Sequence, residues 1–135
     1  MDGEDWANLV SAVDPQRSLD AAILLRRTGT PLAAWTRETV PLDVVSVMTA
    51  TLVGSVETMV EAIHCASPRA IRVETDECRM VATRIDPKTI LVLVASVEVR
   101  QGQVEQQARQ LASQVASQTR DARRLVPAAA PPARA

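Results

Sequence analysis

The sequence predicts an α+β fold, in which helices cover a single antiparallel β-sheet in the element order α-β-β-α-β-β-β-α. Three observations lead to this prediction. Apolar residues make up 47% of the 135 residues, which is enough for the core of one domain. Three stretches repeat apolar residues at helical spacing, and five shorter runs are typical of strands. Within the first pair and the last three of these strands, the links are tight turns, which favours antiparallel pairing.

The chain begins with a predicted helix and a predicted β-hairpin. Apolar residues recur at i, i+3, i+4 and i+7 between Glu4 and Val13, and Asp14 followed by proline ends this helix. The strands Ser18 to Arg26 and Pro31 to Arg37 follow, joined by a turn in which Gly29 provides a positive φ. The first of these strands is apolar nearly throughout, which is typical of a strand buried on both faces.

A long helix is predicted from Pro41 to Ile63. One stripe at helical spacing is assigned to the core: Leu42, Val45, Met48, Leu52, Val56, Met59 and Ile63. A second face consists of small or β-branched residues with almost no charge: Val44, Val47, Thr51, Gly54 and Thr58. One apolar face is enough to join a helix to its own core, so the second face predicts another partner. Gly54 costs about 1 kcal/mol relative to alanine inside a helix, and a close helix–helix crossing would explain its presence.

Three further strands are predicted on short links, at Ala70 to Thr75, Cys78 to Arg84 and Thr89 to Ala95. The first two alternate apolar and polar residues, as strands with one wet face do. The third is apolar on both faces and is expected at the centre of the sheet. The short links indicate that the three strands form a meander.

The last predicted helix runs from Val97 to about Arg124 in a Gln-rich background. Its narrow apolar stripe is expected to lie on one face of the sheet and consists of Val104, Ala108, Leu111 and Val115. The sequence after this helix is rich in proline and alanine, which is typical of disorder. We therefore expect one domain over residues 1–124 and a disordered tail over residues 125–135.

Composition narrows the classes of partner. The net charge is −1, from 15 basic and 16 acidic side chains, which predicts neither a nucleic-acid partner nor a membrane partner. Two Trp are the only aromatic residues, too few for the platforms on which single-stranded bases stack. The N-terminus does not resemble a signal peptide, and no run reaches the ~18–20 apolar residues of a membrane span. We expect a soluble, cytoplasmic protein.

Side chains that carry chemistry are few. His64, the single histidine, stands beside Cys65, but neighbouring helical residues point about 100° apart. A metal site would need further ligands, and Cys78 is the only other thiol. Both cysteines are expected to be reduced and buried. Glu57 and Glu61 are four residues apart on the long helix, a spacing more often found on a solvated face than in a catalytic pair.

No phosphate-binding loop is predicted, because the four glycines are isolated and neither GxxxxGK[ST] nor GxGxxG occurs. Arg26 and Arg27 at the predicted hairpin turn could bind a phosphate or an acidic partner, although such a pair is usually solvated. We therefore assign no catalytic, cofactor-binding or metal-binding residue. An enzyme is the least favoured class.

Three segments together resemble the Roadblock family, which includes dynein light chains and MglB-like proteins. The first, LDAAILLRRTGTPLAAW, is similar to the family's first hairpin, with Gly29 in the turn. The second, LDVVSVMTATLVGSVETMVEAI, is similar to its long central helix. The third, AIRVETDECRMVATRIDPKTILVLVAS, is similar to its three-strand meander. The resemblance covers about Glu4 to Arg124, and it lies in the order of the segments, because each one alone is degenerate.

This resemblance implies a five-stranded sheet of order 2-1-5-4-3, in a profilin-like arrangement with the long helix on one face and the terminal helices on the other. It also implies a homodimer, in which long helices pack together and third strands pair across a two-fold axis. The candidate dimer-interface residues are then Val44, Val47, Thr51, Gly54, Thr58, Ile71 and Val73. Arg26 and Arg27 are weaker candidates for contact with a further partner.

The function implied by the resemblance is that of a non-catalytic, dimeric regulator or adaptor of a small Ras-like GTPase, with no cofactor. A scaffold of the same fold without a GTPase partner is one alternative. A second alternative is a small-ligand or signalling sensor of profilin-like or PAS-like architecture. The sensor predicts a cavity with convergent polar groups. The inward positions are expected to hold mainly Val, Leu, Ile and Met, which disfavours it.

Overall fold

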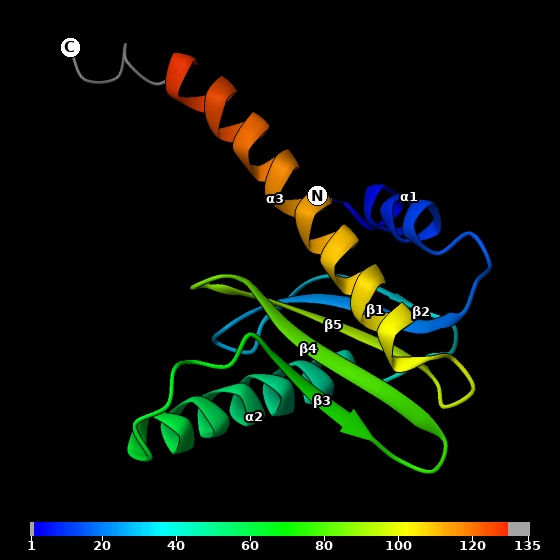
Figure 1. Cartoon of the computed structure of the whole chain (residues 1–135). Helices are drawn as coiled ribbons and strands as arrows, with labels where there is room; N and C mark the ends of the chain where they lie inside the picture. Colours follow the sequence, from blue (N-terminus) through cyan, green and yellow to red (C-terminus); the bar gives the residue numbers. More distant parts are fainter. Residues whose placement is uncertain (1, 130–135) are drawn as a thin grey trace.

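A computed structural model describes residues 2–129, and the side chains of residues 2–118. Within these residues, five antiparallel strands form one sheet of order β2-β1-β5-β4-β3 (Figure 1). The strands are β1 (Leu19–Arg26), β2 (Pro31–Thr36), β3 (Ala70–Glu74), β4 (Cys78–Asp86) and β5 (Thr89–Ser96). The order places β1 and β5 side by side inside the sheet, with Ile23 opposite Val92. The predicted strand order is therefore confirmed.

Helices cover both faces of this sheet. They are α1 (Gly3–Val13), α2 (Leu42–Ala62) and α3 (Gln101–Ala129). Helices α1 and α3 lie on one face, and α2 lies on the other (Figure 1). This confirms the predicted α+β class and element order.

The larger part of the core lies between the sheet and the pair α1 and α3. Trp6 is fully buried there, and its indole Nε1 donates a hydrogen bond to the carbonyl oxygen of Ala22 at 2.9 Å. The stripe that the sequence predicts for the last helix is buried as expected, and consists of Val104, Ala108, Leu111 and Val115. The side chains between this face of the sheet and the two helices are thus buried as in the core of an ordinary globular domain.

A buried carboxylate fixes the passage from α1 into β1. Asp14 is only 4% exposed, and its Oδ1 accepts hydrogen bonds from the amide and the hydroxyl of Ser18 at 2.9 and 2.8 Å. Its Oδ2 accepts from the amide of Leu19 at 2.8 Å, and Gln107 of α3 donates to Oδ1 at 3.2 Å. Asp14 therefore ends α1, as predicted, and also joins α1, β1 and α3.

The core beneath α2 is smaller, and it corrects part of the prediction for this helix. Met48, Met59 and Ile63 were assigned to the inward stripe, but they are 57 to 63% exposed. The buried residues of α2 are instead Ser46, Thr49 and Val53. Both faces of the helix are nearly uncharged, so hydrophobic spacing cannot choose between them. The two hydroxyl side chains Ser46 and Thr49 are thus buried beneath the helix, where hydropathy alone would place them in water.

The end of α2 also differs from expectation. Cys65 is exposed and not buried as predicted, whereas Cys78 is half-buried. His64 has a positive φ of 62°, its amide donates to the carbonyl oxygen of Glu61, and the amide of Cys65 donates to that of Val60. This pair of bonds is the Schellman arrangement that closes a helix, normally with glycine at the left-handed position.

The last helix is displaced relative to its predicted limits. It begins at Gln101 and not at Val97, because residues 97–100 form the turn that follows β5. It also continues past Arg124 to Ala129, into the start of the predicted tail. Residues 130–135, the remainder of that tail, lie outside the described residues. The domain limit at Arg124 stays a prediction.

By length and hydropathy alone, α2 could cross a membrane. A helix packed on the core of a folded domain passes the same test, and the inner face of α2 does pack on the sheet. The high apolar content of α2 comes in part from exposed residues on the side of the helix away from the sheet.

Candidate interaction surface

The side of α2 that points away from the sheet is uncharged, and the exposed carboxylates of Asp43 and Glu61 lie on its flank. We call it the outer face of α2, and it consists of Val44, Val47, Met48, Thr51, Ser55, Thr58 and Met59, together with Ile63 directly after the helix. All eight residues are exposed. Its five large side chains lie toward the two ends of the helix, and smaller hydroxyl residues lie between them. Exposed apolar residues that share one face of a helix commonly mark an interaction site.

The threonine hydroxyls of this face are satisfied within the helix. The hydroxyl of Thr51 donates to the carbonyl oxygen of Val47 at 2.9 Å, and that of Thr58 donates to the carbonyl oxygen of Gly54 at 2.9 Å. A hydroxyl with an internal acceptor loses less on leaving water than one without. These two threonines can therefore enter an apolar contact at low cost.

Gly54 lies at the border of the outer face and is half-buried. A Cβ atom added at this position would meet no heavy atom within 4 Å. The isolated fold of the chain therefore does not require glycine here, although glycine weakens the helix. Close approach of another chain would explain why glycine is present. The close helix–helix crossing expected at Gly54 therefore stays a prediction.

The edge strand β3 lies beside α2 and hydrogen-bonds with β4 on one side only, within the described sheet. Ile71 points to the α2 side and packs against the small core there. Val73 lies two residues further on the same side and is half-buried. An edge of this kind can pair with a strand from another chain.

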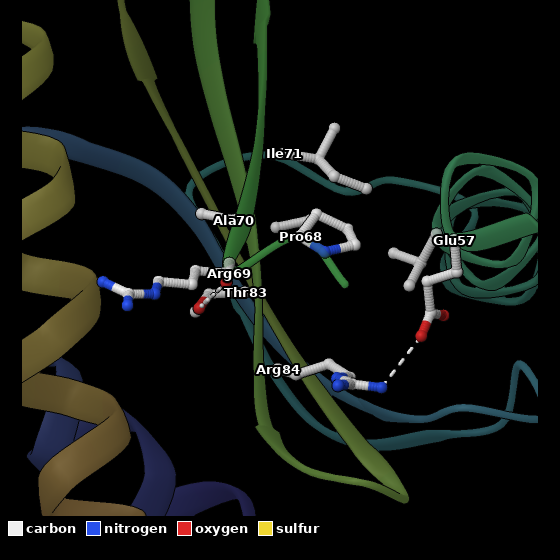
Figure 2. Close-up of a pocket in the computed structure, with 9 residues that line it drawn as sticks. Glu57, Pro68, Arg69, Ala70, Ile71, Thr83 and Arg84 are labelled. Carbon is white, nitrogen blue, oxygen red and sulfur yellow. Dashed lines mark hydrogen bonds and ion pairs between the residues drawn. The ribbon is translucent and has the colours of Figure 1, made fainter. Parts of the chain in front are cut away.

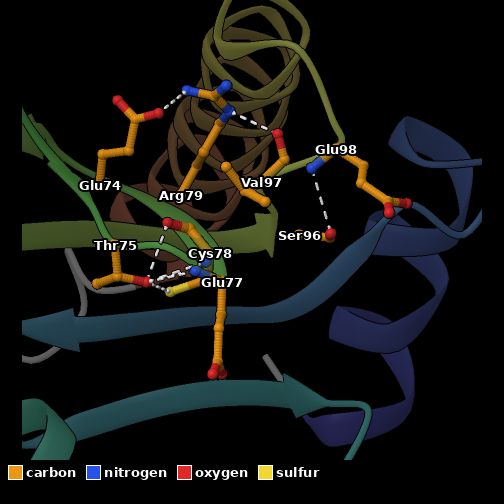
Figure 3. Close-up of polar contacts among 8 residues, drawn as sticks. All are labelled: Glu74, Thr75, Glu77, Cys78, Arg79, Ser96, Val97 and Glu98. Carbon is orange, nitrogen blue, oxygen red and sulfur yellow. Dashed lines mark hydrogen bonds and ion pairs between the residues drawn. The ribbon is translucent and has the colours of Figure 1, made fainter.

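The turn that follows β3 is held by a network of polar contacts (Figure 3). The hydroxyl oxygen of Thr75 accepts hydrogen bonds from the amides of Glu77 and Cys78, at 3.2 and 3.0 Å. Arg79 pairs with Glu74 at 2.7 Å and also donates to the carbonyl oxygen of Val97 at 3.2 Å. These contacts fix the end of β3 and give Cys78 a place in a structural turn.

A carboxylate on α2 joins the helix to the β1–β2 turn and to strand β4. Arg84 of β4 donates to Oε2 of Glu57 at 2.8 Å, as Figure 2 shows, and Arg27 lies 2.5 Å from Oε1. Arg27 first, and then Arg84, hold the pKa of Glu57 below its usual range, although partial burial opposes them. The same contact raises the pKa of Arg27. Glu57 is thus a structural clamp, and its ion pair holds Arg27 on the α2 side, although the Arg27 side chain is 38% exposed.

A crevice beside this clamp is bounded by Val53, Ile71 and Arg84 (Figure 2). Its volume is about 10 Å³, which is room for about one water molecule. The crevice cannot hold the ligand that a sensor domain would bind. Among the described residues, no group of three or more His, Cys, Asp or Glu side chains could hold a metal ion.

The structure brings most of the predicted interface residues together. Val44, Val47, Thr51 and Thr58 share the outer face of α2, with Gly54 at its border. Ile71 and Val73 lie on neighbouring β3. Sequence reasoning missed that Met48, Met59 and Ile63 belong to the same surface, because it placed them in the core. Two uncharged faces left no hydropathy signal that could have corrected this.

Known proteins share this fold. A family model described as Roadblock/LC7 domain matches residues 7–95. A structure of MglB with tetrameric arrangement is similar, with a TM-score of 0.76 and 17% identity over 84% of this chain and 87% of that chain. The Roadblock/LC7 domain from Streptomyces avermitilis gives 0.75 and 18%, over 87% of this chain and 98% of that one. Profilin IA from Acanthamoeba castellanii gives 0.61 and 15%, over 84% and 98%. No curated protein matches. At these identities, the structural likeness shows the fold alone.

Proposed function

Because the chain belongs to the Roadblock/LC7 domain family, we propose that it is a non-catalytic, homodimeric regulator or adaptor of a small Ras-like GTPase. The outer face of α2 is the observation that carries the proposal. It gives the chain a large uncharged surface that its own fold leaves in water. The similarity to an MglB structure described as tetrameric supports self-association.

The distribution of side chains on this face suits a second copy of the same chain. In a two-fold pair, a contact between one residue and another occurs twice. If two α2 helices cross antiparallel near Gly54, Val44 of one copy faces Ile63 of the other, and Met48 faces Met59. The smaller Thr51 and Ser55 then lie at the crossing, where the helix backbones approach most closely. The face is therefore complementary to itself.

The edge strand β3 extends the same proposed interface. Antiparallel pairing of two β3 strands would join two sheets and satisfy the backbone groups on the free edge of each strand. Ile71 and Val73 would then lie beside the crossing helices. An interface with a strand pair and a helix pair resists dissociation better than either contact alone.

Solution mass tests the dimer. We expect light scattering to give a dimer for the natural chain and a monomer for Met48→Glu and for Met59→Glu. Both positions are more than half exposed, so the substitutions should leave the monomer folded by circular dichroism. Gln110→Glu on exposed α3 adds the same charge away from α2 and should remain dimeric. A natural chain that is monomeric at micromolar concentration contradicts the proposal.

The GTPase partner needs its own experiment. Purified Ras-like GTPases of the source organism, loaded with GDP or with a non-hydrolysable GTP analogue, are titrated with the protein by calorimetry. Hydrolysis of GTP is followed in parallel. We expect one GTPase to bind in a nucleotide-dependent way, with or without faster hydrolysis. A dimer that binds none of them leaves the scaffold without a GTPase as the better description.

A further inference from the structure

A groove of about 540 Å³ lies on the α3 side of the sheet, opposite the outer face of α2. It is formed where the β1–β2 and β4–β5 turns meet, and the amide of Arg27 donates to the carbonyl oxygen of Lys88 at 2.8 Å between these turns. Helix α3 forms one wall before it continues beyond the sheet (Figure 1). The lining residues used below are Leu24, Arg26, Leu32, Ile85, Lys88 and Val115.

The groove has an apolar floor. Leu24 and Val115 are buried at its base, and Ile85 is half-buried. Leu32, on the edge strand β2, is 40% exposed and borders the groove. An apolar side chain placed here would remove these surfaces from water, which is favourable at roughly 25 cal/mol per Å² of apolar area.

The rim of the groove is positively charged. The two adjacent arginines at the end of β1 lie on opposite sides of the sheet, so that only one of them pairs with Glu57. Arg27 is held by Glu57 on the α2 side. Arg26 lines the groove together with Lys88, and neither forms an ion pair with a described residue. The carboxylate of Asp86 also lies here, and its Oδ1 accepts the amide of Lys88 at 2.7 Å as part of the turn. The rim therefore carries two cations and one carboxylate.

We propose that this groove docks a segment of another protein in which apolar side chains are flanked by carboxylates. A small anion alone would leave the apolar floor in water. An uncharged apolar segment would desolvate Arg26 and Lys88 without a partner, which is costly. A segment that carries both kinds of group satisfies the floor and the rim together, and the charges also speed its encounter. The groove lies on the face away from α2, so the docking does not depend on the proposed dimer.

A defined peptide pair tests this site on the full chain. One peptide alternates pairs of Leu and Glu, and its counterpart has Lys in place of each Glu. We expect the acidic peptide to bind and to shift the amide resonances of Leu24, Leu32 and Ile85 in NMR spectra. Added salt should weaken its affinity, because the rim contacts are between exposed charges. The basic peptide should not shift these resonances.

Two variants and a control complete the test. The double substitution Arg26→Glu with Lys88→Glu should weaken the acidic peptide more than tenfold, and Leu32→Ser should weaken it several-fold without altering the charge. Arg69→Glu reverses an exposed charge outside the groove and should leave affinity unchanged. The proposal is overturned if the acidic peptide does not bind, if it shifts α2 and not the groove, or if both peptides bind equally. Light scattering on the same samples reports the dimer separately.

Discussion

Nη1 of Arg84 on β4 donates a hydrogen bond to Oε2 of Glu57 on α2 at 2.8 Å, and Arg27 faces the other oxygen of this carboxylate. The pKa of Glu57 is therefore lower in the folded chain than its ordinary value of 4.5. A lowered pKa stabilises the fold fully above the unfolded value, and this contribution is lost as pH falls through the folded value. The clamp should hold α2 to the sheet at neutral pH and weaken in acid.

Replacing Glu57 by Gln should lower the free energy of unfolding by about 1 kcal/mol at neutral pH, as expected for partly exposed charged hydrogen bonds. The difference from the natural chain should shrink as pH falls below about 4.5. Urea unfolding followed by Trp fluorescence measures both, at one protein concentration because dimers dissociate on dilution. Glu61→Gln is the matched control, one turn further along α2 and exposed. A constant difference at all pH values would show that the pKa of Glu57 is not lowered.

Asp14→Ala should destabilise the chain by about 3 kcal/mol. The substitution leaves the amides of half-buried Ser18 and fully buried Leu19 without their acceptors. Asp14→Asn keeps one oxygen and should lose less. The midpoint of urea unfolding measures these effects, with Asp76→Ala in an exposed turn as the control. Equal midpoints for Asp14→Ala and the control would show that water replaces the carboxylate.

His64→Gly should raise the free energy of unfolding by up to about 1 kcal/mol. His64 occupies a left-handed backbone position with φ of 62°, where a side chain carries a steric cost and glycine does not. The thermal midpoint should rise by a few degrees. Ala62→Gly, inside the last turn of α2, should lower the midpoint because its backbone is helical. A fall for His64→Gly would instead reveal a stabilising contact of the imidazole ring.

Gly29→Ala should destabilise by about 2 kcal/mol. Gly29 has a φ of 100°, and an added Cβ would lie 3.2 Å from the Cα of Val47 on α2. The strain and the contact both act against alanine, so the β1–β2 turn would move away from the helix. Gly102→Ala is the control near the start of α3, where an added Cβ meets nothing within 4 Å and should be neutral or stabilising. In chemical unfolding, the free energy of unfolding should therefore fall for Gly29→Ala and stay equal or rise for Gly102→Ala.

Sequence reasoning was most successful where one face of an element is apolar and the other is polar. The stripe from Val104 to Val115 lies in a Gln-rich helix, so its inward side was evident. Gly29 was placed in the first turn with a positive φ, and the structure has it there. In both cases, the residue types close together in the sequence are compatible with only one local arrangement. The strand order came from the family resemblance, because the pattern of one chain does not fix which strands pair.

The sequence was least informative about α2 and about contacts between distant residues. Ser46 and Thr49 are buried while Met48 is exposed, an arrangement opposite to the one that hydropathy predicts. The ion pair of Arg27 with Glu57 joins a turn to a helix, and spacing along the chain cannot show it. The same pair decides that only Arg26 is left to line the groove. The sequence could therefore show which element each candidate residue belongs to, but it could not show the direction in which each side chain points.

The position of β5 between β1 and β4 has a consequence for the newly made chain. A ribosome releases α1, β1, β2 and α2 before β5 exists, so β1 has β2 on one side and no strand on the other. Part of its apolar surface stays uncovered until β5 has been synthesised. Translation that stops before β5 would therefore release an aggregation-prone fragment and not a smaller folded domain. Productive folding must therefore wait until β5 has been synthesised.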